Sequence, residues 1–185
     1  MVIAAGSLLD FEGDAIVNAA NQGGSGGFGI DELVNRAGGY ELKEARKQFG
    51  TIDTGTAKYT QSYEHKKVKY IIHTVGPVYR IPFTQRFQTE EEKREFLIQK
   101  DPLLEQAYQS SLQLAKELQV ETLGFSLLSA GVFRGERSLE DILLIGLRSV
   151  MKHTPPSLKE VTLVCWTQEE QDCLVKLLHQ EMPSQ

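Results

Sequence analysis

Residues 15–39 have the sequence AIVNAANQGGSGGFGIDELVNRAGG and contain the most informative pattern of the chain. It begins with an apolar run, passes through asparagines into a glycine-rich segment, and shows the apolar spacing of an α-helix after Asp31. This order predicts a strand, a loop and the start of a helix. Glycines adopt positive φ and let main-chain N–H groups approach a ligand closely, so the loop is suited to bind an anion, with phosphate expected, at the helix N-terminus.

Strand and helix patterns alternate along the rest of the chain. Strands are expected at residues 2–5, 55–63, 70–75, 122–128 and 161–166, and helices at 31–37, 40–49, 102–118, 138–153 and after Thr167. Such alternation favours an α/β sandwich with helices on both faces of a largely parallel sheet. Ligands of these sheets bind beyond the carboxyl ends of the strands, where the first corner should meet a second small-residue corner at 129–135.

Length and composition indicate an ordinary globular protein. The 185 residues are expected to form one domain, 1–185, with an exposed insertion at 80–100, where the chain becomes polar and charged. The two cysteines, Cys165 and Cys173, are too few for a disulfide framework, and no cluster with zinc-ligand spacing is present. No run approaches the roughly 18 to 20 apolar residues of a membrane span. We therefore expect a cytoplasmic or nuclear protein that does not associate with a membrane and uses no metal or cofactor.

The charge balance bears on the class of partner. A formal net charge of −5 argues against general nucleic-acid binding, because that affinity rests on clustered Lys and Arg side chains. The net negative charge does not exclude binding of a small anionic ligand, since main-chain amides that point at an anion act at contact distance.

Residues 24–29 match the dinucleotide fingerprint G-x-G-x-x-G and stand between a predicted strand and a helix. Two features disfavour a nicotinamide enzyme. Polar residues separate the strand from the first glycine of the motif. About 20 positions later the sequence is KQFGTID, which is not an apolar strand that ends in an acidic residue.

Several dispersed motifs resemble one family. They are NAAN at 18–21, the ten-residue step from Asn21 to Asp31, HTVGPVY at 73–79 and SAGVFRG at 129–135. Together they resemble the macrodomain family, in particular its MacroD-like ADP-ribosylhydrolase branch, from Gly6 to about Leu178. The resemblance implies a three-layer α/β/α sandwich around a mixed six-stranded sheet, with ADP-ribose as ligand.

The resemblance also implies a function. The expected activity is hydrolysis of mono-ADP-ribose from modified Asp and Glu side chains of proteins, with O-acetyl-ADP-ribose as a further substrate. The alternative is a reader module that binds ADP-ribosylated proteins without turnover. The expected partners are ADP-ribose and mono-ADP-ribosylated proteins, the expected state is a monomer, and nucleic acid is not expected to bind.

Site residues follow by resemblance. Asn21 and Asp31 are the expected catalytic pair at the distal ribose, where a carboxylate can orient or deprotonate a water and an amide can hold a hydroxyl. Whether Asp31 is a base or only orients a water stays open. The residues expected to bind ADP-ribose are Ser7, Leu8, Gly26, Gly27, Phe28, Gly29, Ile30, Ser129, Ala130, Gly131, Val132, Phe133, Arg134 and Trp166.

Each of these residues also has a structural interpretation. Asp31 is suited to cap its helix, Phe133 to join the core, and Trp166 to end a buried strand. Asn18 is expected to satisfy turn backbone, and His73, within an apolar strand, to be a buried histidine with satisfied hydrogen bonds.

The sequence departs from the family pattern at four places. One is the first loop, which reads Gly27-Phe28-Gly29 where an unbroken glycine run is usual. Ser7 stands where many members have an aspartate that contacts adenine, residues 134–136 read Arg-Gly-Glu, and Asn35 replaces a histidine. A neutral hydroxyl makes a weaker contact than a carboxylate, so weaker adenine recognition is expected.

Overall fold

A single mixed sheet forms the centre of the computed structural model, which describes residues 1–24 and 26–182. Its strands lie in the order β1-β6-β5-β2-β4-β3, and all neighbours are parallel except β3 and β4. The strands are β1 (Val2–Ala5), β2 (Ala15–Ala19), β3 (Ala57–Gln61), β4 (Tyr70–Thr74), β5 (Thr122–Ser126) and β6 (Glu160–Cys165). The mixed six-stranded sheet confirms the predicted fold class.

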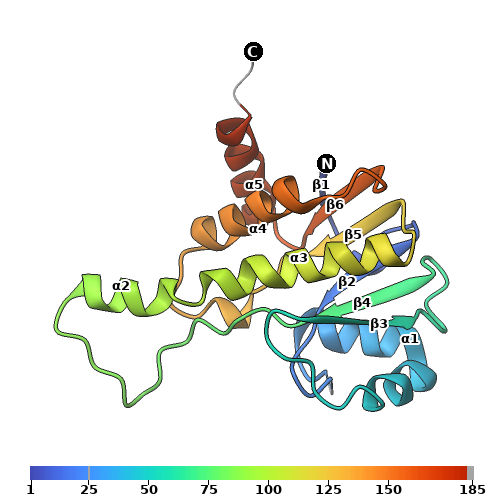
Figure 1. Cartoon of the computed structure of the whole chain (residues 1–185), viewed down its shortest axis with the longest axis horizontal. Coiled ribbons are helices and arrows are strands. Elements are labelled where there is room, and N and C mark those ends of the chain that lie inside the picture. Colours follow the sequence, from blue (N-terminus) through green and yellow to red (C-terminus); the bar gives the residue numbers. More distant parts are fainter. Residues whose placement is uncertain (25, 183–185) are drawn as a thin grey trace.

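Helices cover both faces of this sheet (Figure 1). They are α1 (Gly29–Lys47), α2 (Glu90–Ile98), α3 (Asp101–Glu117), α4 (Leu139–His153) and α5 (Gln168–Glu181), with short 3₁₀ turns at Leu8–Asp10 and Val132–Arg134. The larger core lies between the sheet and α3, α4 and α5, and a smaller one lies under α1 on the opposite face. Because β2 is covered on both faces, Ala15, Ile16 and Val17 are fully buried, which explains its continuous apolar sequence.

Helix α1 differs from the prediction of two separate helices. One element runs from Gly29 to Lys47, with a kink at Gly39, where φ is 75° and ψ is −161°. This left-handed backbone favours glycine, and a Cβ here would collide with the Glu64 carboxylate. The glycine pair therefore redirects the helix, whereas we expected it to end the helix.

Residues 80–100 contain α2, which with the preceding loop extends away from the sheet (Figure 1). The Thr89 hydroxyl caps α2 by accepting the N–H of Glu92, and Leu97 is buried against the core. None of the helices in the described part of the chain is long and apolar enough to cross a bilayer.

Candidate functional site

Two joined cavities lie at the carboxyl ends of the central strands, where this fold class binds ligands. The first, here called the Asn21 cavity, has a volume of about 210 Å³. The second, the Trp166 cavity, has a volume of about 310 Å³. Both are lined by Gly29, Ile30 and Gly131, so they form one cleft between the two predicted loops.

The N-terminus of α1 opens into this cleft. Its N-cap residue, Phe28, provides no side-chain acceptor for the first turn, and Gly29 and Ile30 line both cavities. Unpaired N–H groups and the helix dipole favour an anion here. The loop before the helix is tightly packed at Gly26, where φ is 75° and a Cβ would lie 2.6 Å from the Asn35 amide nitrogen. A larger residue at Gly26 would strain this backbone and displace the side chains of Asn35 and Glu32.

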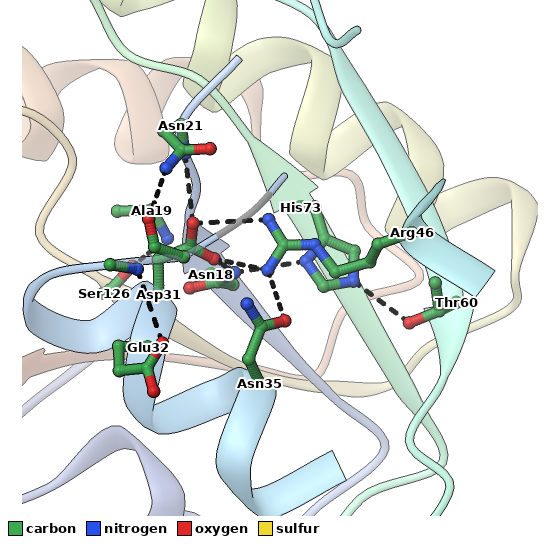
Figure 2. A network of polar contacts seen from close by, with 12 residues as sticks. Asn18, Ala19, Asn21, Asp31, Glu32, Asn35, Arg46, Thr60, His73 and Ser126 are labelled. Atoms are coloured by element: carbon green, nitrogen blue, oxygen red, sulfur yellow. Dashed lines mark hydrogen bonds and ion pairs between the residues drawn. The ribbon is translucent and has the colours of Figure 1, made fainter. Parts of the chain in front are cut away.

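Asn21 lines the Asn21 cavity and lies beside Asp31 (Figure 2). Its side-chain amide donates to the Gly26 carbonyl at 2.6 Å, and its main-chain N–H donates to Asp31 Oδ2 at 3.2 Å. The remaining acceptor, Asn21 Oδ1, has no hydrogen-bond partner among the described residues. This oxygen is also buried, so its missing hydrogen bond costs stability in the free protein.

Asp31 forms a buried ion pair with Arg46 (Figure 2). Arg46 Nη1 donates to Asp31 Oδ1 at 2.6 Å and to Asn35 Oδ1 at 2.7 Å, and the Asp31 and Arg46 side chains are only 5% and 1% exposed. Asp31 lies in the first turn of α1, and its carboxylate accepts hydrogen bonds from Arg46, Asn18 and the N–H of Asn21. The capping interpretation of Asp31 is therefore wrong.

The ion pair continues into the sheet as a chain of hydrogen bonds. The Asn18 amide donates to Asp31 Oδ1 at 2.7 Å and lies 3.1 Å from His73 Nδ1, while His73 Nε2 lies 3.0 Å from the Thr60 hydroxyl. Burial, with a smaller contribution from the Arg46 charge, holds the pKa of His73 well below its ordinary value. A neutral imidazole that accepts at Nδ1 and donates from Nε2 fits these contacts. The structure thus confirms the prediction of a buried, hydrogen-bonded His73.

The second loop meets the end of β4. The Ser129 hydroxyl donates to the Pro77 carbonyl at 2.8 Å, and the Tyr79 N–H donates to the Phe133 carbonyl at 2.8 Å. Phe133 is half-buried, packs against the small core around Val75 and also lines the Asn21 cavity. Trp166 is 67% exposed and lines the other cavity, so its interpretation as a core residue is wrong.

Most of the predicted site residues line the cleft. Ser7, Gly27 and Arg134 line neither cavity, and the Ser7 hydroxyl instead accepts the N–H of Leu9 at 3.2 Å. The residues brought together are Leu8, Asn21, Gly26, Phe28, Gly29, Ile30, Asp31, Ser129, Ala130, Gly131, Val132, Phe133 and Trp166.

The sequence interpretation missed several residues of the cleft and its support. The lining also includes Gly76, Leu127 and Glu170. Arg46 lies behind the lining and donates a hydrogen bond to Asp31. Gly76 belongs to the HTVGPVY motif, which was a usable signal. Arg46 had no comparable local signal, because it is one of several basic residues on an apparently exposed helix. Among residues 1–24 and 26–182, no group of three His, Cys, Asp or Glu side chains could hold a metal ion.

Comparisons with known proteins agree with this geometry. Residues 17–138 match the family model of the Macro domain. The chain is 38% identical over 128 residues to ADP-ribose glycohydrolase MACROD2 of Xenopus laevis, an alignment that covers 69% of this chain and 27% of that protein. It is 32% identical over 182 residues to the O-acetyl-ADP-ribose deacetylase of Escherichia fergusonii, covering 95% and 93%.

A solved structure, the Trypanosoma brucei macrodomain in complex with ADP, has a TM-score of 0.77 at 27% identity, covering 95% of this chain and 67% of that one. The layered fold and its cleft thus define the class, an α/β/α protein with a site suited to a phosphate-containing ligand. The chain belongs to the macrodomain family. It spans only about a quarter of the length of MACROD2, as the 27% coverage shows.

Proposed function

We propose that this protein binds ADP-ribose in the joined cavities and hydrolyses mono-ADP-ribose from modified Asp and Glu side chains of proteins. One observation carries the proposal. An uncapped helix N-terminus opens into the middle of a cleft that has an exposed tryptophan at one end and the unpaired acceptor of Asn21 at the other. These features match, in order, the diphosphate, the adenine and the distal ribose of ADP-ribose.

The relatives support the same ligand. Those cited above are named for ADP-ribose glycohydrolase and O-acetyl-ADP-ribose deacetylase activities, and the trypanosomal structure contains ADP. Both named reactions release a group from ADP-ribose with water. We therefore extend the proposal to O-acetyl-ADP-ribose as a smaller substrate.

In the proposed reaction, water cleaves the ester between the ribose and the acyl group, and the products are ADP-ribose and a free carboxylic acid. Asn21 is the group that would contact the substrate, through Oδ1. Asp31 is better suited to positioning than to proton abstraction, because both of its oxygens already accept hydrogen bonds. It holds the main-chain N–H of Asn21, while the Gly26 carbonyl holds the Asn21 side-chain amide.

The test uses an acceptor protein that has been auto-modified with labelled mono-ADP-ribose. The parent protein should release the label, and Asn21→Ala should lower the rate by about 10²- to 10³-fold, which is typical when one preorganised hydrogen bond is removed. Gln109→Ala, at an exposed position on α3, is the control and should keep the parent rate. Release by Asn21→Ala at the parent rate would contradict the role of Asn21.

The buried ion pair favours a second candidate, a reader module. Both oxygens of Asp31 are engaged, by Arg46, by Asn18 and by the N–H of Asn21, so binding without turnover is consistent with the same geometry. The assay separates the two functions. No release of label, together with calorimetric binding of ADP-ribose, would identify a reader.

A further inference from the structure

A third cavity continues from the distal end of the cleft. It has a volume of about 380 Å³ and is here called the Lys100 groove. It shares Asn21, Gly76 and Phe133 with the Asn21 cavity and shares no lining residue with the Trp166 cavity. The other residues that line it are Gln22, Thr54, Val75, Pro77, Val78, Lys100 and Leu103.

The position of the groove determines what can reach it. With adenine at Trp166, the distal ribose of ADP-ribose lies beside Asn21, at the end where the groove begins. A group attached to the anomeric carbon of that ribose therefore leaves the cleft past Phe133. The groove is the cavity that continues from there among the described residues.

The floor of the groove is apolar. Val75 and Pro77 are buried at the end of β4, and Val78 and Leu103 are partly exposed beside them. Gln22 and Thr54 form a polar side of the groove, where the Gln22 amide donates to the Thr54 hydroxyl at 3.3 Å. An apolar floor with polar groups at its side suits a short peptide segment with mixed side chains.

Lys100 adds a positive charge. Its ammonium donates to the Val78 carbonyl at 2.6 Å, which fastens together the two ends of the 80–100 insertion. No carboxylate of the described residues lies within ion-pair distance of it, although many other lysines here have such a partner. The same ammonium lies 5.6 Å from the centroid of the Phe96 ring, and the Val78 bond uses one of its three donors.

We propose that the Lys100 groove binds the acceptor segment of the ADP-ribosylated protein and that Lys100 pairs with an acidic side chain next to the modified residue. This inference rests on the proposed function and specifies which protein segments around the modified residue the site would prefer. Charge complementarity and continuity with the ribose site both favour an acidic segment over a basic or neutral one.

The test measures binding by calorimetry, so it does not depend on turnover. Two synthetic peptides carry ADP-ribose through a non-hydrolysable linkage, one flanked by Asp and Glu and the other by Asn and Gln. The parent should bind the acidic peptide about 2- to 5-fold more tightly, the range expected for one exposed ion pair, and high salt should reduce the difference. Lys100→Gln should abolish the preference and Lys100→Glu should reverse it, while affinity for free ADP-ribose stays unchanged.

Lys116→Gln is the matched control, because it removes the same charge from an exposed position on α3, about 24 Å further along the helix. It should keep the preference, and thermal melting should show that all variants are folded. Equal affinities of the parent for the two peptides, with ADP-ribose still bound, would overturn the groove proposal alone. Failure of the parent to bind free ADP-ribose would overturn the proposed function and this inference with it.

Discussion

Two aspartates lie near opposite ends of β2, and each pairs with a basic residue, but their surroundings differ. Asp14 precedes the strand. Its Oδ1 accepts from the Lys69 ammonium at 2.8 Å, and its Oδ2 accepts from the N–H groups of Glu121 and Thr122 at 3.0 and 3.1 Å. Lys69 is 72% exposed, so water screens this pair. Both Asp14 oxygens are satisfied, and the arrangement joins β2 to its neighbours.

Asp31 lies beyond the other end of β2, away from water. Around it, Asn18 Oδ1, Asn21 Oδ1 and Arg46 Nε have no hydrogen-bond partner among the described residues. Unsatisfied buried groups cost stability. The aspartate before β2 is thus fully hydrogen-bonded and partly screened by water, whereas the aspartate at the cleft belongs to a buried polar cluster whose hydrogen bonds are incomplete.

Among the substitutions considered, Arg46→Met should have the largest effect on stability. It leaves the Asp31 carboxylate buried without its partner, and we expect the free energy of unfolding to fall by about 3 to 5 kcal/mol. Urea denaturation at pH 7 measures this loss. The double variant with Asp31→Asn, in which no buried charge is left unpaired, should recover part of it.

Lys47→Met, at the next position and with a 68% exposed side chain, is the control. It should change the free energy of unfolding by less than about 0.5 kcal/mol. Equal losses in Arg46→Met and Lys47→Met would show that the buried ion pair contributes no more to the free energy of unfolding than an exposed lysine does.

The contrast between Arg46 and Lys47 also shows how far the sequence can be interpreted. The strands, the glycine corners and the capping box of Thr167 and Glu170 were predictable, because their signals lie within a few residues. The Asp31–Arg46 pair was not. In a straight helix, positions 15 apart are separated by about 22 Å, beyond the reach of a guanidinium. Only the kink at Gly39 brings them together.

Trp166 shows a second reason why the site was only partly predictable. Its strand, β6, is buried up to Cys165, and local hydrophobicity alone assigned the next residue to the core as well. The strand ends one residue earlier than predicted, and this places the indole at the mouth of the cleft. Such a shift lies within the usual uncertainty of an element boundary.

His73→Gln should change how the free energy of unfolding depends on pH. The folded pKa of His73 is depressed by burial and by Arg46, so below about pH 6.5 the unfolded chain takes up a proton that the folded chain does not. The stabilising contribution is therefore present above pH 6.5 and is lost as the pH falls. From pH 7 to pH 5 the parent should therefore lose more stability than His73→Gln.

Urea denaturation at pH 7, 6 and 5 measures this difference. The pKa of His65 is also lowered by burial, but His65 is present in both proteins, so its contribution cancels in the comparison. His179→Gln, which replaces an exposed histidine on α5, is the control and should follow the parent. Parallel curves for the parent and His73→Gln would contradict the prediction.

Asp14→Asn tests the amino end and should have the smallest effect. The hydrogen bond from Lys69, together with those from the N–H groups of Glu121 and Thr122, lowers the pKa of Asp14 to about 2 against the opposing effect of burial. The contribution is present above about pH 4 and is lost as the pH falls toward 2, because the unfolded chain binds the proton first. We expect a loss of about 1 kcal/mol at pH 7, measured by urea denaturation, that shrinks below pH 4.

The calorimetric affinity of Asp14→Asn for ADP-ribose should stay unchanged, since Asp14 lies at the end of β2 opposite the cleft. A weaker affinity would show that the two ends of the strand are coupled.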